Sequence, residues 1–192
     1  MGFIKSLGAA PHLYDVMKTS PRMAVYLFKM TDEIMLVEGP LNDKDRELIA
    51  AYVSGLNACS FCYRGHKAIA QMFGVEEGLI DQLVEDLETA NIDEKMKAAL
   101  RYSKKLTEKP GKMEIADAEA LYSAGWNEAA LMNISEVCAL FAMYNRLADG
   151  TGVIAGNTKT TLTENKKHGT YIQNLIDFGL EVPEDMKPVV DI

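Results

Sequence analysis

Two cysteines and a histidine stand at a spacing that could support thiol chemistry. Cys59 and Cys62 are three residues apart, and His66 follows four residues later. If the chain is helical from Cys59 onward, the three side chains share one face. We expect Asn57 to cap this helix, so that Cys59 falls in its first turn and Cys62 just beyond. The N–H groups at a helix start favour a thiolate, which is the reactive form of cysteine.

A dithiol at this spacing can cycle between reduced and oxidised forms. One thiolate attacks the O–O bond of a peroxide and becomes a sulfenic acid, with which the second thiol condenses to a disulfide. His66, one turn along, can take the proton of the thiol and return one to the leaving alkoxide. Glu47, on the preceding helix, can orient that imidazole or balance its charge. The candidate catalytic residues are therefore Cys62, Cys59, His66 and Glu47.

The same side chains also suit chemistry other than that of a redox dithiol. The four residues are of ligand types that suit zinc, but structural zinc sites usually take their second ligand pair from a distant segment. We therefore expect neither a metal nor an organic cofactor. A c-type haem needs a histidine directly after the second cysteine, where Tyr63 stands. A thioredoxin-type fold is excluded, because its CxxC follows a strand and this sequence predicts no strand before Cys59. A redox- or metal-responsive binding module remains the non-enzymatic alternative.

Composition restricts the class of protein and its partners. The chain has 192 residues, of which 48% are hydrophobic and 25% charged, so it can bury a sizeable core. The formal net charge of −8 argues against nucleic acid or an anionic membrane as a partner. We find neither a signal peptide nor an apolar run of about 18 residues that could span a membrane. A cytoplasmic protein is expected, in which Cys138 is a small buried hydrophobe.

The sequence pattern predicts an all-α fold. Apolar periodicity and capping residues predict helices over 12–18, 21–38, 43–56, 59–73, 76–87, 93–107, 116–123, 127–148 and 169–178, a polar loop over 155–165 and a tail over 183–192. The helix over 43–56 is apolar through most of its middle and should be buried on most sides, with Glu47 near its polar start. Sustained alternation with period two, which would predict strands, does not occur.

A single domain over residues 1–192 is expected. Residues 20–110 carry the CxxC motif, 111–155 would form a second, degenerate half, and 156–192 a C-terminal extension. The two most apolar helices each follow a shorter amphipathic unit and begin after an asparagine cap, Asn42 (or Asp43) and Asn127. This arrangement predicts an internal repeat of helices in which only the first half retains a CxxC.

The spacing Glu47-x11-Cys59-x2-Cys62-x3-His66 resembles the signature of the alkylhydroperoxidase D-like proteins, within the carboxymuconolactone decarboxylase superfamily. The direct resemblance covers roughly residues 20–110. A later segment, Asn145-Arg-Leu-Ala-Asp149, is similar to one in the peroxidase-related subgroup of that superfamily. The resemblance implies an all-α fold with an internal repeat, assembled as a homo-oligomer: a dimer, trimer or hexamer.

The resemblance also implies roles for single residues. Cys62 matches the cysteine that becomes the sulfenic acid and Cys59 its resolving partner and proton donor, while His66 and Glu47 match the proton-relay pair. The best-studied members carry a histidine just before the second cysteine, where this chain has Phe61. An apolar ring there removes one relay group and changes access to the thiols.

The function that follows is a thiol-dependent hydroperoxide reductase. Its partners would be a hydroperoxide and a thiol or dithiol electron donor, such as a thioredoxin-like or lipoyl protein. The lactone decarboxylases of the superfamily generally lack the CxxC pair, so a decarboxylase-like, non-redox activity is the weaker enzymatic expectation.

Overall fold

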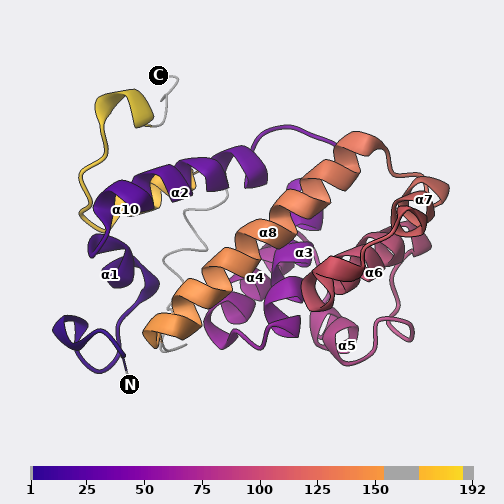
Figure 1. Ribbon diagram of the computed structural model, residues 1–192, viewed down its shortest axis with the longest axis horizontal. Coiled ribbons are helices and arrows are strands. Elements are labelled where there is room, and N and C mark those ends of the chain that lie inside the picture. Colours follow the sequence, from indigo (N-terminus) through magenta and orange to yellow (C-terminus); the bar gives the residue numbers. More distant parts are fainter. Residues whose placement is uncertain (1, 154–168, 188–192) are drawn as a thin grey trace. The chain divides into compact units, whose positions relative to one another are not determined.

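The regular secondary structure is helical throughout residues 2–153 and 169–187, the parts that this computed structural model describes. The helices are α1 (Leu13–Lys18), α2 (Pro21–Met35), α3 (Asp43–Leu56), α4 (Ser60–Met72), α5 (Leu79–Glu85), α6 (Glu94–Glu108), α7 (Ile115–Ser123), α8 (Glu128–Thr151) and α10 (Tyr171–Asp177) (Figure 1). Short 3-10 turns lie at Lys5–Leu7, Pro110–Lys112 and Glu184–Met186. The predicted all-α class is confirmed. The loop predicted over 155–165 and the end of the predicted tail lie outside the described residues.

The helices belong to two compact units. One unit combines Met1–Val37 with Ala148–Ile192, and the other is Glu38–Leu147. The second unit contains α3 to α7 and most of α8, and it holds all four candidate catalytic residues. The organisation into one domain with halves at 20–110 and 111–155 and an extension at 156–192 stays a prediction, as does the internal repeat.

Helix α3 is the buried helix of the second unit. Every residue from Arg46 to Ser54 is buried, and Ile49 to Val53 have no exposed surface. The helix packs against α4, α5 and α6. Each fully buried large aliphatic side chain contributes about 1.5–3 kcal/mol, so α3 is the anchor of this unit. The predicted cap is also present, because the Asn42 side chain accepts a hydrogen bond from the Asp45 N–H at 2.9 Å.

Several predicted helix boundaries are wrong by a few residues. The helix predicted over 76–87 is the shorter α5, because Gly78 has φ +81, a left-handed conformation that does not continue into a helix. Helix α2 ends at Met35 and not at residue 38. Helix α8 continues three residues past the predicted end, to Thr151, where Gly152 at φ +73 ends it.

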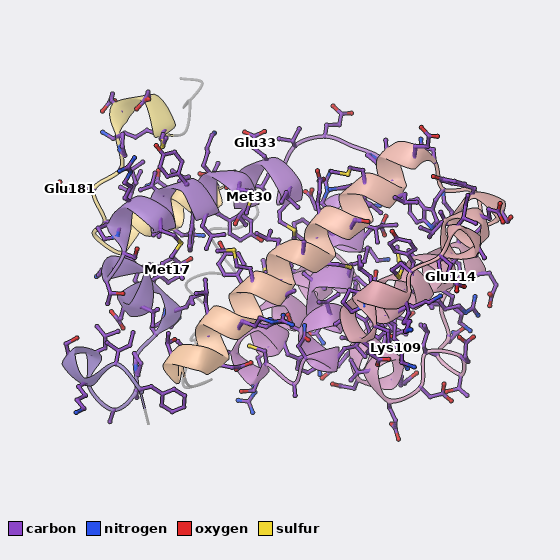
Figure 2. All side chains as sticks on the ribbon, in the orientation of Figure 1. Met17, Met30, Glu33, Lys109, Glu114 and Glu181 are labelled. Carbon is purple, nitrogen blue, oxygen red and sulfur yellow. The ribbon has the colours of Figure 1, made fainter. Side chains whose placement is uncertain are left out.

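The first unit contains α1, α2 and α10. Asp32 of α2 accepts backbone hydrogen bonds from Tyr171 at 2.5 Å and Ile172 at 3.3 Å, so this carboxylate caps the start of α10. Met17 of α1 is fully buried, whereas Met30 and Glu33 of α2 are exposed (Figure 2). Within residues 2–153 and 169–187, none of the helices combines the length and the hydropathy that a membrane span requires.

Candidate active site

A tight turn joins α3 to α4 and positions Cys59 at the start of α4. The Ala58 N–H donates to the Gly55 carbonyl at 2.9 Å, and the Cys59 N–H donates to the Ser54 carbonyl at 3.0 Å. Ala58 adopts φ +56, a left-handed conformation that costs a residue with a Cβ about 1–2 kcal/mol. The strained turn therefore persists only because its surroundings hold it.

The start of α4 differs from the prediction. Asn57 is the C-cap of α3 and does not cap α4, because the chain turns back at Ala58 before the next helix begins. Cys59 is itself the N-cap, with extended angles of φ −78 and ψ 94, and α4 begins at Ser60. Cys62 is consequently the third helical residue and lies in the first turn. Cys62 therefore lies among the N–H groups of the first turn, whereas the Cys59 side chain, at the N-cap, makes no capping hydrogen bond with them.

Both cysteines of the motif are buried. Cys59 has no exposed surface and Cys62 is 4% exposed, and both are present as thiols. Cys62 and His66 are four residues apart within α4, so they are neighbours on one face of that helix. Both sulfurs are therefore shielded from bulk water.

His66 and Glu47 form the central polar contact of the site. His66 Nδ1 lies 2.6 Å from Glu47 Oε2, and the two side chains are only 14% and 5% exposed. The His66 ring also packs edge-on against Phe141 of α8, with ring centroids 4.3 Å apart at 76°. With Nδ1 engaged by the carboxylate, Nε2 on the opposite side of the ring is the atom that can exchange a proton with a reacting group.

A buried amide network, missed from the sequence, holds the turn in front of Cys59. Asn145 of α8 is 1% exposed; its Nδ2 donates to Ser54 Oγ at 3.0 Å, and its Oδ1 accepts from Asn57 Nδ2 at 2.9 Å. Both partners lie at the end of α3, next to the turn. Asn145 stood out in the sequence only through a family resemblance. Its partners are 88 and 91 residues away, and no local pattern connects them.

A second buried network lies at the start of α3. The Arg46 side chain is 3% exposed; its Nε donates to Asn133 Oδ1 at 3.2 Å and its Nη1 to Asp43 Oδ1 at 3.3 Å. Burial lowers the pKa of Arg46, and the nearby carboxylates of Asp43 and Asp45 oppose this shift. These bonds fix the turn of α3 that carries Glu47.

A pocket of about 360 Å³ opens beside Cys59. It is lined by Ser54, Gly55, Ala58, Cys59, Ser60, Tyr63, Asp81, Val84 and Glu85, which come from α3, the turn, α4 and α5. A Cβ on Gly55 would lie 2.6 Å from Val84 Cγ2 and 3.2 Å from the Tyr63 ring, so only glycine lets these helices approach here.

Polar side chains form a hydrogen-bond network at the rim of this pocket. The Tyr63 hydroxyl donates to the Asp81 carboxylate, and Lys67 Nζ donates to both of its oxygens at 2.7 and 2.5 Å. Hydrogen bonds from Lys67 and Tyr63 hold the pKa of Asp81 below its ordinary value. Burial and, next, the Asp81 carboxylate raise the pKa of Tyr63.

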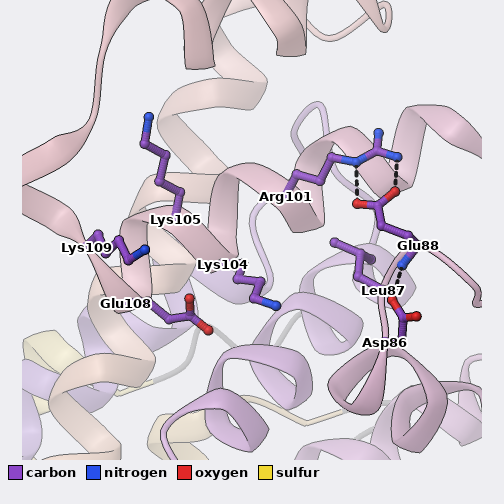
Figure 3. A pocket seen from close by; sticks show the side chains of 8 residues that line it. All are labelled: Asp86, Leu87, Glu88, Arg101, Lys104, Lys105, Glu108 and Lys109. Atoms are coloured by element: carbon purple, nitrogen blue, oxygen red, sulfur yellow. Dashed lines mark hydrogen bonds and ion pairs between the residues drawn. The ribbon is translucent and has the colours of Figure 1, made fainter.

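Another pocket, of about 240 Å³, lies between α6 and residues 86–88 (Figure 3). Its lining is charged, and part of this charge is paired: Arg101 donates to both carboxylate oxygens of Glu88, at 2.8 and 2.5 Å. Lys105 donates to Asp117 at 2.9 and 2.7 Å. The residues of the CxxC motif do not line this pocket.

The third cysteine, Cys138, lies outside the CxxC motif. Cys138 is 3% exposed in α8, and burial raises the pKa of its thiol to about 12, so the prediction of a small buried side chain is confirmed. Among residues 2–153 and 169–187, no group of three or more His, Cys, Asp or Glu side chains is arranged to hold a metal ion.

The fold and the site together define a class: all-helical proteins with a CxxC at a helix start beside a histidine–carboxylate pair. Residues 21–105 match the model of the carboxymuconolactone decarboxylase family. An uncharacterised peroxidase-related protein from Silicibacter sp. TM1040 is 27% identical, with a TM-score of 0.71 over 87% of this chain and 83% of that one. A second uncharacterised peroxidase-related protein, the alkylhydroperoxidase AhpD core from Ralstonia eutropha JMP134, is 26% identical, with a TM-score of 0.70 over 73% of this chain and 74% of that one.

Residues 21–105 thus carry the carboxymuconolactone decarboxylase family match, and the chain is similar over most of its length to peroxidase-related, alkylhydroperoxidase D-like proteins. The same fold occurs in the debrominase Bmp8, whose structure with 2,3,4-tribromopyrrole aligns at 17% identity with a TM-score of 0.67 over 91% of this chain and 85% of that one. No curated protein matches the chain.

Proposed function

We propose that this protein is a thiol-dependent hydroperoxide reductase. The observation that carries the proposal is the 2.6 Å contact between His66 and Glu47, one helical turn from Cys62 in the first turn of α4. A buried imidazole held by a carboxylate can move protons, and a thiol at a helix start is readily deprotonated. Cys59, the N-cap of the same helix, supplies the second thiol.

The first step consumes the hydroperoxide. His66 takes the thiol proton of Cys62, and the thiolate attacks the terminal oxygen of ROOH. The S–O bond forms as the O–O bond breaks, and the electron pair leaves on the alkoxide. His66 returns its proton to this alkoxide, so an alcohol departs and Cys62 becomes a sulfenic acid. Glu47 holds the imidazole and stabilises it while it carries the extra proton.

The second step closes a disulfide. The Cys59 thiolate attacks the Cys62 sulfur, the S–S bond forms, and hydroxide leaves as water after it takes the proton that Cys59 released. A thiol or dithiol donor then returns two electrons and restores both thiols. Phe61 lies between the two cysteines, half-buried, so the only imidazole that this scheme uses is that of His66.

Stopped-flow oxidation by an alkyl hydroperoxide tests the proposal. Cys62→Ser should abolish rapid peroxide consumption, whereas Cys59→Ser should stop at a sulfenic acid that dimedone labels at Cys62. Cys138→Ser is the matched control, because it removes a thiol that lies outside the motif, and it should retain the wild-type rate. The proposal fails if Cys62→Ser consumes peroxide as fast as the wild type.

The same variants separate the alternatives. A non-redox, decarboxylase-like activity would survive in a protein in which Cys59 and Cys62 are both serine. A metal-responsive module would contain stoichiometric zinc after purification and would resist alkylation at both cysteines.

The proposal includes a cytoplasmic homo-oligomer with a thiol or dithiol donor, such as a thioredoxin-like or lipoyl protein. Exposed apolar side chains favour self-association: Tyr26 and Met30 on α2 are 54% and 42% exposed, and Met132 and Met143 on α8 are 57% and 39% exposed. Light scattering on the purified protein measures the oligomer number.

A further inference from the structure

We propose that the pocket beside Cys59 receives a small thiol without negative charge, and that this thiol reduces the oxidised protein by attacking Cys59 and not Cys62. The inference rests on the proposed function, which supplies the disulfide form. It starts from an asymmetry between the two sulfurs. Cys59 belongs to the lining of this pocket, whereas Cys62 and His66 do not.

The helix start decides which sulfur is the better leaving group. Attack on Cys59 expels the thiolate of Cys62, which lies in the first turn of α4 and one turn from the His66–Glu47 pair. The N–H groups of the first turn and a protonated imidazole both stabilise that thiolate. Exchange is faster when the leaving thiol has the lower proton affinity.

The opposite attack is disfavoured for the same physical reason. Attack on Cys62 would expel the thiolate of Cys59 beside a pocket whose lining includes Gly55, Ala58 and Val84. Apolar surroundings raise the cost of a thiolate. The geometry therefore assigns Cys59 as the electrophilic sulfur and Cys62 as the leaving group.

The electrons and protons of the exchange balance with thiols alone. A donor thiolate forms a bond to Cys59 Sγ as the Cys59–Cys62 bond breaks, and the electron pair leaves on Cys62. A second donor thiol, or the second thiol of a dithiol, attacks the donor sulfur of this mixed disulfide and releases Cys59. The donor ends as a disulfide, and the two protons that the donor thiols lose restore the protein thiols.

The size and charge of the pocket restrict the donor. A volume of about 360 Å³ admits a small thiol or the end of a flexible arm, and Cys59 is fully buried, so the lining side chains must move before the donor reaches it. Asp81 is paired with Lys67, whereas Glu85 adds an exposed carboxylate to the rim. The whole chain also carries a formal charge of −8. An anionic thiol is therefore repelled at the entrance.

The attacked sulfur can be identified directly. The wild-type protein is oxidised with diamide, so that the experiment does not depend on peroxidase activity, treated briefly with 2-mercaptoethanol, and quenched with acid and N-ethylmaleimide. Trypsin releases both cysteines in one peptide, Glu47–Arg64, whose fragment ions separate them. We expect mercaptoethanol on Cys59 and maleimide on Cys62. The reverse pattern, or an equal mixture, would overturn the proposal.

Matched thiols and matched variants test the pocket itself. The reduction rate with 2-mercaptoethanol is compared with that of 3-mercaptopropionate, each corrected for its thiolate fraction. In water, a like charge about 6 Å from an anionic thiol raises its energy enough to slow its attack roughly threefold. Glu85→Gln removes such a charge, so the ratio of the 2-mercaptoethanol rate to the 3-mercaptopropionate rate should fall by about that factor. Glu77→Gln, the same change at an exposed residue outside the pocket, should leave the preference unaltered.

A second variant tests the volume. Val84→Phe replaces an isopropyl group with a larger phenyl ring that fills part of the pocket, so it should slow reduction by both thiols at least tenfold. The proposal is wrong if Val84→Phe is reduced at the wild-type rate, or if Glu85→Gln and Glu77→Gln behave alike. Because diamide forms the disulfide in every case, these outcomes are independent of whether the protein turns over a hydroperoxide.

Discussion

Replacing Asn145 by alanine tests how the turn in front of Cys59 is held. The change removes the hydrogen bonds to Ser54 at 3.0 Å and to Asn57 at 2.9 Å. The Ser54 hydroxyl is fully buried and loses a partner there, which costs about 1–2 kcal/mol. The Asn57 amide is half-buried and can bond to water instead, so losing its hydrogen bond costs about 0.5–1 kcal/mol. We expect the free energy of unfolding to fall by about 1.5–3 kcal/mol.

Urea denaturation of the reduced protein measures this loss. Asn91→Ala is the control, because Asn91 is exposed and its replacement should stay within about 0.5 kcal/mol of the wild type. Adding Ser54→Ala to Asn145→Ala removes the stranded hydroxyl, so the two changes should couple by about 1 kcal/mol. A loss below about 0.5 kcal/mol for Asn145→Ala, or no coupling with Ser54→Ala, would refute the reasoning.

The same variant has a local consequence that global unfolding does not produce. The turn contains Ala58 at φ +56 and is strained, so without Asn145 it should relax and expose Cys59. Alkylation of Cys59 in the folded protein should then accelerate, while alkylation of Cys138 in the middle of α8 should not. Equal acceleration at both cysteines would indicate general destabilisation and not a role of Asn145 in the turn.

Three further predictions concern buried groups. Glu47→Gln keeps an acceptor for the imidazole but removes the charge, so oxidation of Cys62 by hydroperoxide should slow by about 10- to 100-fold in stopped-flow traces; an unchanged rate would exclude the relay. The Tyr52 hydroxyl is buried without a hydrogen-bond partner among the described residues, so Tyr52→Phe should raise the free energy of unfolding by about 0.5–2 kcal/mol, and a loss of stability would contradict this. Burial raises the pKa of Cys138 to about 12, above the ~8.5 of an unfolded cysteine, so the folded state holds a proton that the unfolded chain releases. Stability should therefore decline as the pH rises above about 8.5, and Cys138→Ala should flatten that decline in urea titrations between about pH 8 and 10.

Much of the fold could be read from the sequence because its signals are local. Asn42 precedes an apolar run and caps α3, and Asn127 caps α8 with a 2.8 Å bond from the Ala130 N–H. Capping and apolar periodicity act within a few residues, so a single sequence contains them. The errors arose where backbone conformation overrode the pattern, as at Gly78, whose φ of +81 shortened a predicted helix.

The start of α4 is the most instructive error. Asn57 is a good N-capping residue by type, but it is the C-cap of α3 and its amide bonds to Asn145. The left-handed turn at Ala58 then moves the helix start to Ser60. Capping preference is a local signal, and it cannot register that the Asn57 amide bonds to a residue 88 positions away.

The sequence by itself determined the helical class and the four side chains that the candidate site contains, because residue type and i, i+3, i+4 spacing require nothing beyond one or two helices. Only the tertiary structure decided that Glu47 reaches His66, that Asn145 holds the turn, and that the pocket opens toward Cys59 and not Cys62. Those contacts join α3, α4, α5 and α8, and their distances depend on how whole helices pack. Packing of this kind is a property of the complete buried core, which no short stretch of sequence contains.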